Sequence, residues 1–326
     1  MTTTELIRPG APPTPRARVA GLDVARFLVL AGMVVAHLCP PVGYTGVLVD
    51  GLPSALFAAL AGVSMVFLTP GRLVVRGAIL IALHWALTPI AGVIDVVLLA
   101  MGLSFLAAAV FVRRSTATVA AGAAAAAGLS WVIAALQDAA VPLPAVLGAP
   151  YPLFAWLCFQ LAGLCAGRLL LNNPRRAARV LAVAAPLAAA GIAARLLVNP
   201  DTDPVGLSAH SGGLGDIAVS LAASATVLCA CLVAVRGTGG ALRPLAAAGA
   251  MPLTLYVAHI ATAGPLVTSD LSTYEHPVAL AATLLGFVAF AAAWRHFFNR
   301  GPLEAALAAT SRTLAPGPAR TQKDKD

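Results

Sequence analysis

The chain has 326 residues, of which 60% are hydrophobic and 10% are charged, and its mean hydropathy is +0.88. An average soluble domain carries roughly 25% charged residues, so this composition excludes a water-soluble protein of this length. The high apolar content also excludes a disordered chain. An isoelectric point near 9.9 suggests nucleic-acid binding. The basic residues, however, follow the predicted membrane sides rather than one patch, so we expect no nucleic acid as a partner.

Long apolar stretches predict an all-α, polytopic integral membrane protein. A membrane-spanning helix needs roughly 20 mostly apolar residues. Ten segments qualify, and their boundaries also allow eight or eleven spans. Pro89 and Gly92 supply the turn between the third segment and the fourth. The expected spans are residues 20–38, 52–69, 73–90, 93–112, 117–136, 151–171, 178–198, 216–235, 245–265 and 277–297.

The basic residues predict how these helices are oriented. If the N-terminus lies in the cytoplasm, 19 of the 21 Lys and Arg residues fall in inner loops, at inner helix ends or in the two tails. The exceptions are Arg26, inside the first span, and Arg195, near the outer end of the seventh. This asymmetry follows the positive-inside rule, so we expect both termini inside. Residues 1–17 and 307–326 are expected to be disordered cytoplasmic tails that flank one transmembrane domain, residues 18–306.

The first predicted helix carries three ionisable residues on one face. Ionisable side chains inside a membrane are costly and are functional candidates by default. At 3.6 residues per turn, Arg26 and His37 differ by only about 20°, and Asp23 lies on the same side. The rise per residue places Arg26 and His37 roughly 16 Å apart along the axis. We expect a polar path with Arg26 near the inner side and His37 near the outer side, and all three are candidate catalytic residues. Asp23 and Arg26 could instead form a structural ion pair.

Other polar residues are expected to contact substrate. Tyr44 and Asp50 lie between the first two spans, and His210 lies in the outer loop before the eighth. Tyr256 and His259 lie one turn apart on the ninth span. Arg195 is expected to reach outward or to pair with Asp201. The five cysteines show no metal-ligand spacing, and no metal is expected.

The helix 1 residues also carry a resemblance to known proteins. The spacings Asp-x13-His and Arg-x10-His, from Asp23 and Arg26 to His37, resemble the first helix of the transmembrane acyltransferases. The rest of the chain is more similar to the heparan-alpha-glucosaminide N-acetyltransferase-like branch, and to bacterial membrane proteins of YeiB type, than to the bacterial envelope O-acyltransferases. The further segments that match are residues 50–64, 210–213, 250–259 and 297–304.

This resemblance implies an acyltransferase in the cytoplasmic membrane of a bacterium. The donor would be cytoplasmic acyl-CoA, expected to be acetyl-CoA. The acceptor would be a sugar amine or hydroxyl on the far side, carried by an envelope glycan or a lipid-linked sugar. Membrane lipid is the other expected partner, and a homodimer is compatible with the resemblance. In the envelope O-acyltransferases the Arg and the His of the first helix are both needed, and these roles carry over to Arg26 and His37.

One departure from the resemblance assigns the chemistry to His37. In the glucosaminide branch the catalytic histidine lies in the loop after the first helix, but this chain has no histidine between Cys39 and Leu52. A histidine with a pKa near 6.5 suits a general base in acyl transfer, or could carry the acyl group itself. Arg26 lies too far along the helix to stabilise charge at His37, and its guanidinium suits the phosphates of CoA.

Two other functions fit the same features. A transporter or flippase for a small solute or a lipid-linked sugar would also have a polar path across the membrane. Transporters often contain internal repeats, and we find no convincing repeat between the two halves of the chain. A non-catalytic relative that scaffolds an envelope complex would explain the missing loop histidine.

Overall fold

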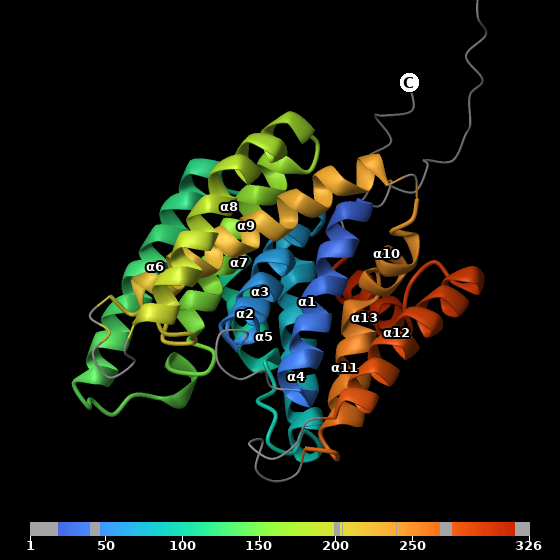
Figure 1. The fold of residues 1–326 in the computed structure, drawn as a ribbon, viewed down its shortest axis with the longest axis horizontal. Helices are drawn as coiled ribbons and strands as arrows, with labels where there is room; N and C mark the ends of the chain where they lie inside the picture. The colour runs from blue at the N-terminus through green and yellow to red at the C-terminus, as the bar shows by residue number, and fades with distance from the viewer. Residues whose placement is uncertain are drawn as a thin grey trace, which may run out of the picture.

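The computed structural model of the chain describes residues 19–39, 46–198, 203, 205–238, 240–267 and 276–316, and every regular element in those ranges is helical (Figure 1). The α-helices are α1 (Ala20–Leu38), α2 (Gly46–Val49), α3 (Leu52–Ser64), α4 (Pro70–Leu87), α5 (Leu98–Ala108), α6 (Thr116–Asp138), α7 (Leu153–Leu170), α8 (Pro174–Leu197), α9 (Leu214–Gly237), α10 (Arg243–Gly249), α11 (Pro252–Ala263), α12 (Pro277–Phe297) and α13 (Pro302–Leu314). Short 3-10 helices are η2 (Met65–Phe67), η3 (Thr88–Ile90) and η4 (Ala145–Leu147).

The helices confirm the expected membrane-type fold. Within the described residues, eight helices or continuous helix pairs are long and apolar enough to cross a membrane, and the bent pair α10 and α11 would make a ninth. These eight correspond to eight of the ten expected spans. The other two expected spans, 93–112 and 245–265, take a different form. The side of the membrane that each end of the bundle faces stays a prediction.

The expected span 93–112 contains only a short helix, α5. Its 11 residues cover roughly 16 Å, about half of the hydrocarbon core of a bilayer. The φ of Gly92 is +61°, which is incompatible with a right-handed helix and interrupts it. Only glycine fits here, because a Cβ would overlap the carbonyl oxygens of Gly264 and Val267. Residues 91–97 therefore form a loop, whose Val93 amide donates to the Val267 carbonyl just beyond α11.

The expected span 245–265 breaks at Met251 into α10 and α11, which meet at an angle of 77°. Pro252 explains the break, since it cannot donate a backbone hydrogen bond and disfavours helical geometry at the preceding residue. Glu304 of α13 then caps α11: its Oε1 accepts from the amides of Leu253 and Thr254 at 2.7 and 3.1 Å. The chain remains helical to Leu314, beyond the expected tail boundary at 307.

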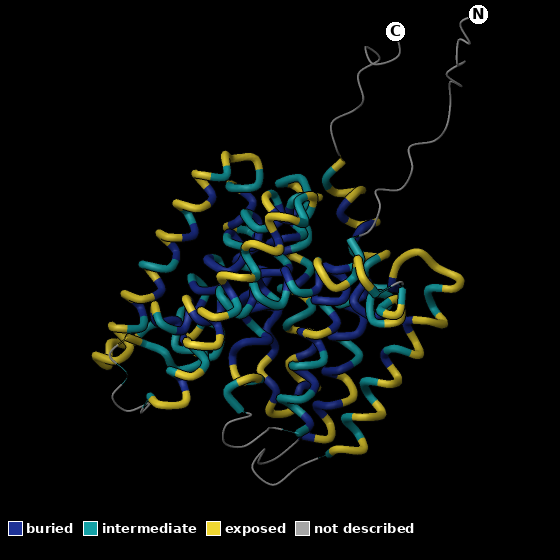
Figure 2. The backbone as a smooth tube through the Cα atoms, turned by 45° about the horizontal axis from the view of Figure 1, so that its top comes forward, coloured by how far each residue is buried: buried dark blue, intermediate teal, exposed yellow. Residues whose placement is uncertain are grey.

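Helix α1 lies at the centre of the bundle and packs against α3, α9, α10, α11 and α12. Figure 2 shows buried backbone concentrated around this centre and exposed backbone along the outer helices. Of the eight long apolar helices, α8 and α12 are the most exposed: only 17% and 11% of the residues in their most apolar stretches are buried. Apolar surface on this scale is unfavourable in water and natural in lipid.

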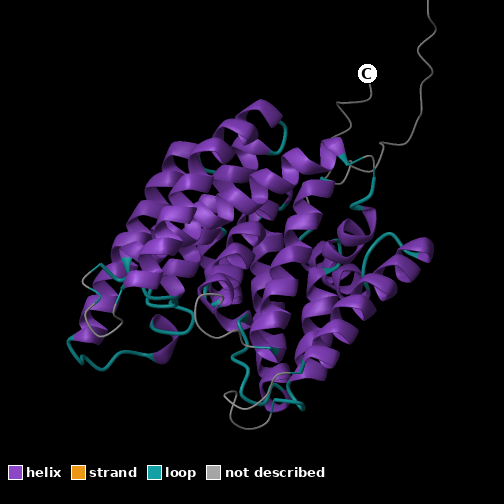
Figure 3. Ribbon diagram, in the orientation of Figure 1, coloured by secondary structure: helices purple, strands orange, loops and turns teal. Residues whose placement is uncertain are grey.

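Most loops gather at the two ends of the bundle (Figure 3). The two ends carry different polar residues. At one end, Arg26 bonds to Ser64 and Arg72 bonds to the Ala315 carbonyl, so the start of α1, the end of α3, the start of α4 and the end of α13 lie together. At the other end, Asp50, Asp95 and His210 line one cavity. This division agrees with the charge asymmetry that predicted the topology.

Close approach between α3 and α7 depends on glycine, and a substitution tests it. A Cβ on Gly163 would overlap the Ala59 carbonyl oxygen, whereas nothing lies within 4 Å of a Cβ on Gly128 of α6. We expect Gly163→Val to lower the melting temperature of the detergent-purified protein, because overpacking costs about 1–3 kcal/mol or more where backbone must move. Gly128→Val is the matched control and should change the melting temperature little. Equal melting temperatures for the two variants would contradict this packing.

Candidate functional site

Two histidines from distant parts of the chain meet inside the bundle. The Nδ1 atom of His37, in the last turn of α1, lies 2.8 Å from Nε2 of His259 on α11. The two rings are coplanar within 1°. His259 is fully buried, and its Nδ1 has no hydrogen-bond partner among the described atoms. His37 is partly exposed to a cavity, so its Nε2 is the nitrogen of the pair that a substrate can reach.

The proton in this pair decides what His37 can do. If His37 donates from Nδ1, its Nε2 keeps a lone pair and can accept a proton from a substrate. If His259 donates from Nε2, the Nε2 of His37 carries the proton instead. When Nε2 of His37 takes up a proton from the cavity and the Nδ1 proton of His37 moves along the shared hydrogen bond to His259, the first arrangement becomes the second, and the pair gains one proton and one positive charge; release of a proton at the cavity reverses the change. The pair can therefore act as a base and as an acid.

The cavity in front of His37, which we call the His37 cavity, has a volume of about 490 Å³. It brings together four residues that the sequence indicated: His37, Asp50, His210 and Tyr256. His259 lies behind His37 rather than in the wall, and Tyr44 lies outside the described residues. The sequence did not single out three further polar residues of the wall as substrate contacts: Ser54, Asp95 and Tyr151.

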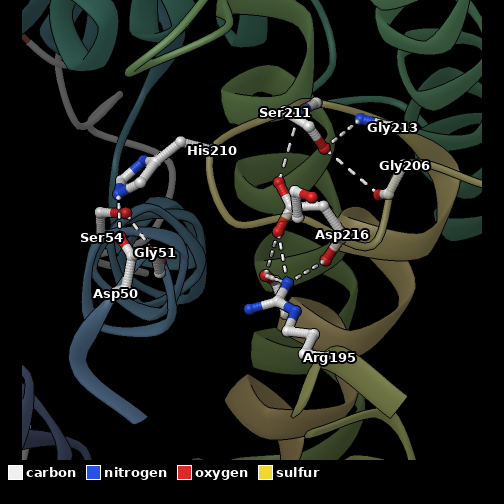
Figure 4. A network of polar contacts seen from close by, with 12 residues as sticks. Asp50, Gly51, Ser54, Arg195, Gly206, His210, Ser211, Gly213 and Asp216 are labelled. Atoms are coloured by element: carbon white, nitrogen blue, oxygen red, sulfur yellow. Dashed lines mark hydrogen bonds and ion pairs between the residues drawn. The ribbon is translucent and has the colours of Figure 1, made fainter. Parts of the chain in front are cut away.

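Asp50 and His210 form a second pair across this cavity. The Nε2 atom of His210 lies 3.3 Å from Oδ1 of Asp50, and its Nδ1 lies 2.6 Å from the Pro150 carbonyl oxygen (Figure 4). Burial alone would lower the pKa of His210, but the hydrogen bond and charge of Asp50, together with the Pro150 carbonyl and the charge of Asp216, outweigh burial and raise this pKa above its usual value. His210 adopts a φ of +62°, which turns its ring out of the loop toward α3.

A buried ion pair holds the loop that carries His210. Arg195 of α8 bonds to the carboxylate of Asp216 in the first turn of α9, and Asp216 also accepts from Ser220 and from the amide of Gly212 (Figure 4). The expected partner Asp201 lies outside the described residues. A buried pair broken on one side leaves an uncompensated charge, so this pair is expected to stay intact. Arg195 and Asp216 therefore hold the loop in place, and neither residue lines the His37 cavity.

Near the other end of α1, Arg26 lines a second cavity, the Arg26 cavity, with a volume of about 200 Å³. Arg26 donates to Asp23 and to the Ser64 hydroxyl, each at 2.6 Å, which confirms the i, i+3 ion pair as a structural contact. Asp23 is buried beneath Arg26 and is not part of the cavity wall. Arg76 of α4 also lines this cavity, and its Nε is buried with no partner among the described atoms.

One layer of side chains separates the two cavities. Tyr256 lines the His37 cavity and Phe57 lines the Arg26 cavity, and their rings stack with centroids 5.9 Å apart. Consecutive residues at the start of α5 divide in the same way: Val97 lines the first cavity and Leu98 the second. The Tyr256 hydroxyl accepts from the Val97 amide at 3.2 Å, which ties the layer to the start of α5.

Within the described part of the chain, no three His, Cys, Asp or Glu side chains gather closely enough to hold a metal ion. The polar groups here are instead paired acids, bases and guanidinium groups. This chemistry suits proton transfer at the His37 cavity and anion binding at the Arg26 cavity.

The chain was compared with known protein families. The family described as "Protein of unknown function (DUF418)" matches residues 167–312. The chain is therefore similar to this family from the end of α7 through most of α13, a part that includes His210, Tyr256 and His259. This agrees with the expected resemblance to YeiB-type membrane proteins, while the acyltransferase resemblance stays a prediction. A comparison with curated proteins found no match.

The Asp50–His210 pair predicts a pH-dependent contribution to stability. Because the folded protein raises the pKa of His210, the contribution is fully present below the pKa of an unfolded histidine and is lost as the pH rises through the raised value. We expect Asp50→Asn to lower the melting temperature by about 1–3 °C at pH 5.5, since an exposed pair is worth little. The difference from wild type should fade toward pH 9. Asp95→Asn, in the same cavity wall, is the control, and a difference that grows with pH would contradict the pairing.

Proposed function

We propose that this protein is an integral membrane acyltransferase of the bacterial cytoplasmic membrane. It moves an acetyl or other acyl group from acyl-CoA on the Arg26 side to a sugar amine or hydroxyl on the His37 side. The observation that carries this proposal concerns one face of α1. At one end of it His37, paired with His259 of α11, opens to a polar cavity, and at the other end Arg26 lines a second cavity together with Arg76 of α4.

The histidine pair supports the base step. In the arrangement where His37 donates to His259, Nε2 of His37 accepts the proton of the acceptor hydroxyl or amine as that atom attacks the thioester carbonyl carbon. The carbon–sulfur bond then breaks, and the sulfur of CoA leaves and receives a proton from the pair. In the alternative route, His37 Nε2 attacks the carbonyl, the carbon–sulfur bond breaks and the CoA thiolate leaves; the acceptor then attacks the acyl group, the bond to Nε2 breaks, and the acceptor's proton passes to the thiolate. Tyr256 can donate from its hydroxyl to the oxygen that becomes negative, because the Val97 amide occupies only its acceptor side.

The Arg26 cavity supports donor binding. Glu304, the acidic residue in its wall, is already engaged by the amides of Leu253 and Thr254 and by the Thr254 hydroxyl. Asp23 neutralises part of Arg26, but the Nε donor of Arg76 is unused among the described contacts. A phosphate-bearing donor would supply the acceptor oxygens that these guanidinium groups lack.

The layer between the cavities sets a requirement on this mechanism. The thioester must reach His37 from the Arg26 side, and the stacked rings of Phe57 and Tyr256 lie between the two cavities. Acyl transfer across the membrane therefore requires that this layer opens enough to admit the narrow end of the donor.

Label transfer tests the proposal directly. Inverted membrane vesicles containing the protein receive radiolabelled acetyl-CoA, and label is followed into envelope sugars and into the protein itself. We expect His37→Ala to lower transfer by roughly 10²–10⁴-fold, because it removes the base. His296→Ala, at the exposed end of α12, is the matched control and should retain activity. Full transfer by folded His37→Ala protein, or none by wild type with several acyl donors, would refute the proposal.

The donor end is tested by a pair of arginine variants. Arg76 lines the Arg26 cavity, whereas Arg72, one turn earlier, bonds to the Ala315 carbonyl outside it. We expect Arg76→Gln to raise the KM for acyl-CoA by roughly 10-fold or more, because a hydrogen bond to a charged group is worth about 1.5–3 kcal/mol. Arg72→Gln should leave this KM within a factor of about two. Equal effects of the two substitutions would place the donor elsewhere.

A transporter or flippase for a small solute or a lipid-linked sugar is the second candidate. The bent pair α10 and α11 favours it, since discontinuous helices commonly form transporter sites. Two cavities separated by one layer also fit alternating access. Vesicles that take up labelled solute without transferring label from acyl-CoA would select this function.

A further inference from the structure

A third cavity opens beside the His37 cavity, toward the outside of the bundle. We call it the Leu28 cavity; its volume is about 290 Å³, close to the lower limit of roughly 300 Å³ for ligand pockets. Its walls come from α1, α2, α3, α8 and α9. The residues that the argument uses are Leu28, Gly32, Leu48, Pro53, Ala188 and Ser224.

The Leu28 cavity adjoins the His37 cavity. Pro53 at the start of α3 lines both of them, and the short helix α2 divides its residues between them. Leu48 faces the Leu28 cavity, whereas Val47 and Val49 face the His37 cavity. Gly32 of the Leu28 cavity packs against Pro53, where a Cβ would lie 2.9 Å from the proline ring. The two cavities therefore lie on either side of Pro53, and a molecule with its head in the His37 cavity would reach the Leu28 cavity by passing this residue.

The cavity opens at membrane depth. Leu28 is 44% exposed and Leu48 is 53% exposed, although both line the cavity. Leu28 lies near the middle of α1, roughly 14 Å along the helix axis from His37. The part of the opening that Leu28 forms therefore lies at the depth of the bilayer hydrocarbon, whereas Leu48 lies nearer the His37 end of α1.

The walls suit an alkyl chain and exclude a polar ligand. None of the lining residues is charged, and the Thr226 hydroxyl is already bonded to the Ala222 carbonyl. Ser224 alone offers a buried hydroxyl without a partner among the described residues. A sugar or nucleotide would lose its hydrogen bonds to water here without replacing them.

From these observations we infer that the acceptor is a lipid-linked molecule, whose polar head binds in the His37 cavity and whose alkyl chain lies in the Leu28 cavity. This inference rests on the proposed acyl transfer and names the class of its acceptor. A chain leaving lipid for an apolar cavity gains no hydrophobic free energy, because the two surroundings are alike. The gain is positional: the seated chain holds the nucleophile of the head near Nε2 of His37.

A matched pair of variants tests the cavity. Ala188 lines it, whereas the adjacent Ala189 is exposed on the outer surface of α8. In vesicles with labelled acetyl-CoA, products are separated into a fraction extracted by organic solvent and a water-soluble fraction. We expect wild-type label in the organic fraction, a loss of about tenfold or more in Ala188→Phe, and little change in Ala189→Phe. Leu28→Trp, at the open mouth, repeats the test if Ala188→Phe does not fold.

Photo-crosslinking tests the same site without catalysis. The probe is dodecyl β-glucoside with a diazirine near the end of its chain. Crosslinked peptides are mapped in the wild type, in Ala188→Phe and in Ala189→Phe. Crosslinks at residues lining the Leu28 cavity that are lost only in Ala188→Phe support the inference. Crosslinks spread evenly over outer helices such as α12 overturn it.

The two readouts separate the inference from the proposed function. If label enters only water-soluble products and Ala188→Phe is fully active, acyl transfer stands and the lipid-linked acceptor is wrong. If no label moves at all, acyl transfer fails, and the acceptor assignment falls with it whatever the crosslinks show.

Discussion

The hydrogen bond between His37 and His259 joins the first helix of the bundle to a helix more than 200 residues later. Inside a membrane there is no water to satisfy an imidazole nitrogen, so each buried ring needs a partner on another element. His37 provides that partner for the buried His259, and the two rings align in one plane. The position of α11 against α1, and with it the wall of the His37 cavity, depends on this contact.

The break between α10 and α11 makes this contact geometrically accessible. Pro252 ends the preceding helix, and the carboxylate of Glu304 replaces the hydrogen bonds that the start of α11 lacks. The segment around Gly301 and Glu304, near the end of the described chain, therefore holds the first turn of the helix that carries His259. Such a cap costs little to keep, because its charge lies at the positive end of a helix dipole.

The sequence predicted the positions of the helices better than it predicted which side chains pair between them. Apolar runs of about 20 residues identified the long helices, because membrane thickness constrains length directly. Helical periodicity also placed Asp23, Arg26 and His37 on one face. The exceptions were the segments where backbone detail decides the outcome: the positive φ of Gly92 shortened one expected span, and Pro252 divided another. Hydropathy averages over a window and does not register either effect.

The candidate site was only partly predictable for a related reason. His37, Asp50, His210, Tyr256 and His259 all reach the same region, but their pairing did not follow from local spacing. Periodicity describes neighbours on one helix, whereas His37 pairs with His259, and Asp50 with His210, through tertiary packing. Asp95 and Tyr151 could have been suspected only as acidic and aromatic residues at the expected outer ends.

The stacked rings of Phe57 and Tyr256 have a consequence for the cell as well as for the substrate. A continuous polar channel containing histidines and arginines would conduct protons, and each elementary charge that crosses a 100 mV potential releases about 2.3 kcal/mol. Two aromatic rings between the cavities interrupt such a channel in this conformation. The layer that must open in the proposed acyl transfer therefore also acts as an electrical insulator, which allows a protein with polar cavities at both ends to reside in an energised membrane without discharging it.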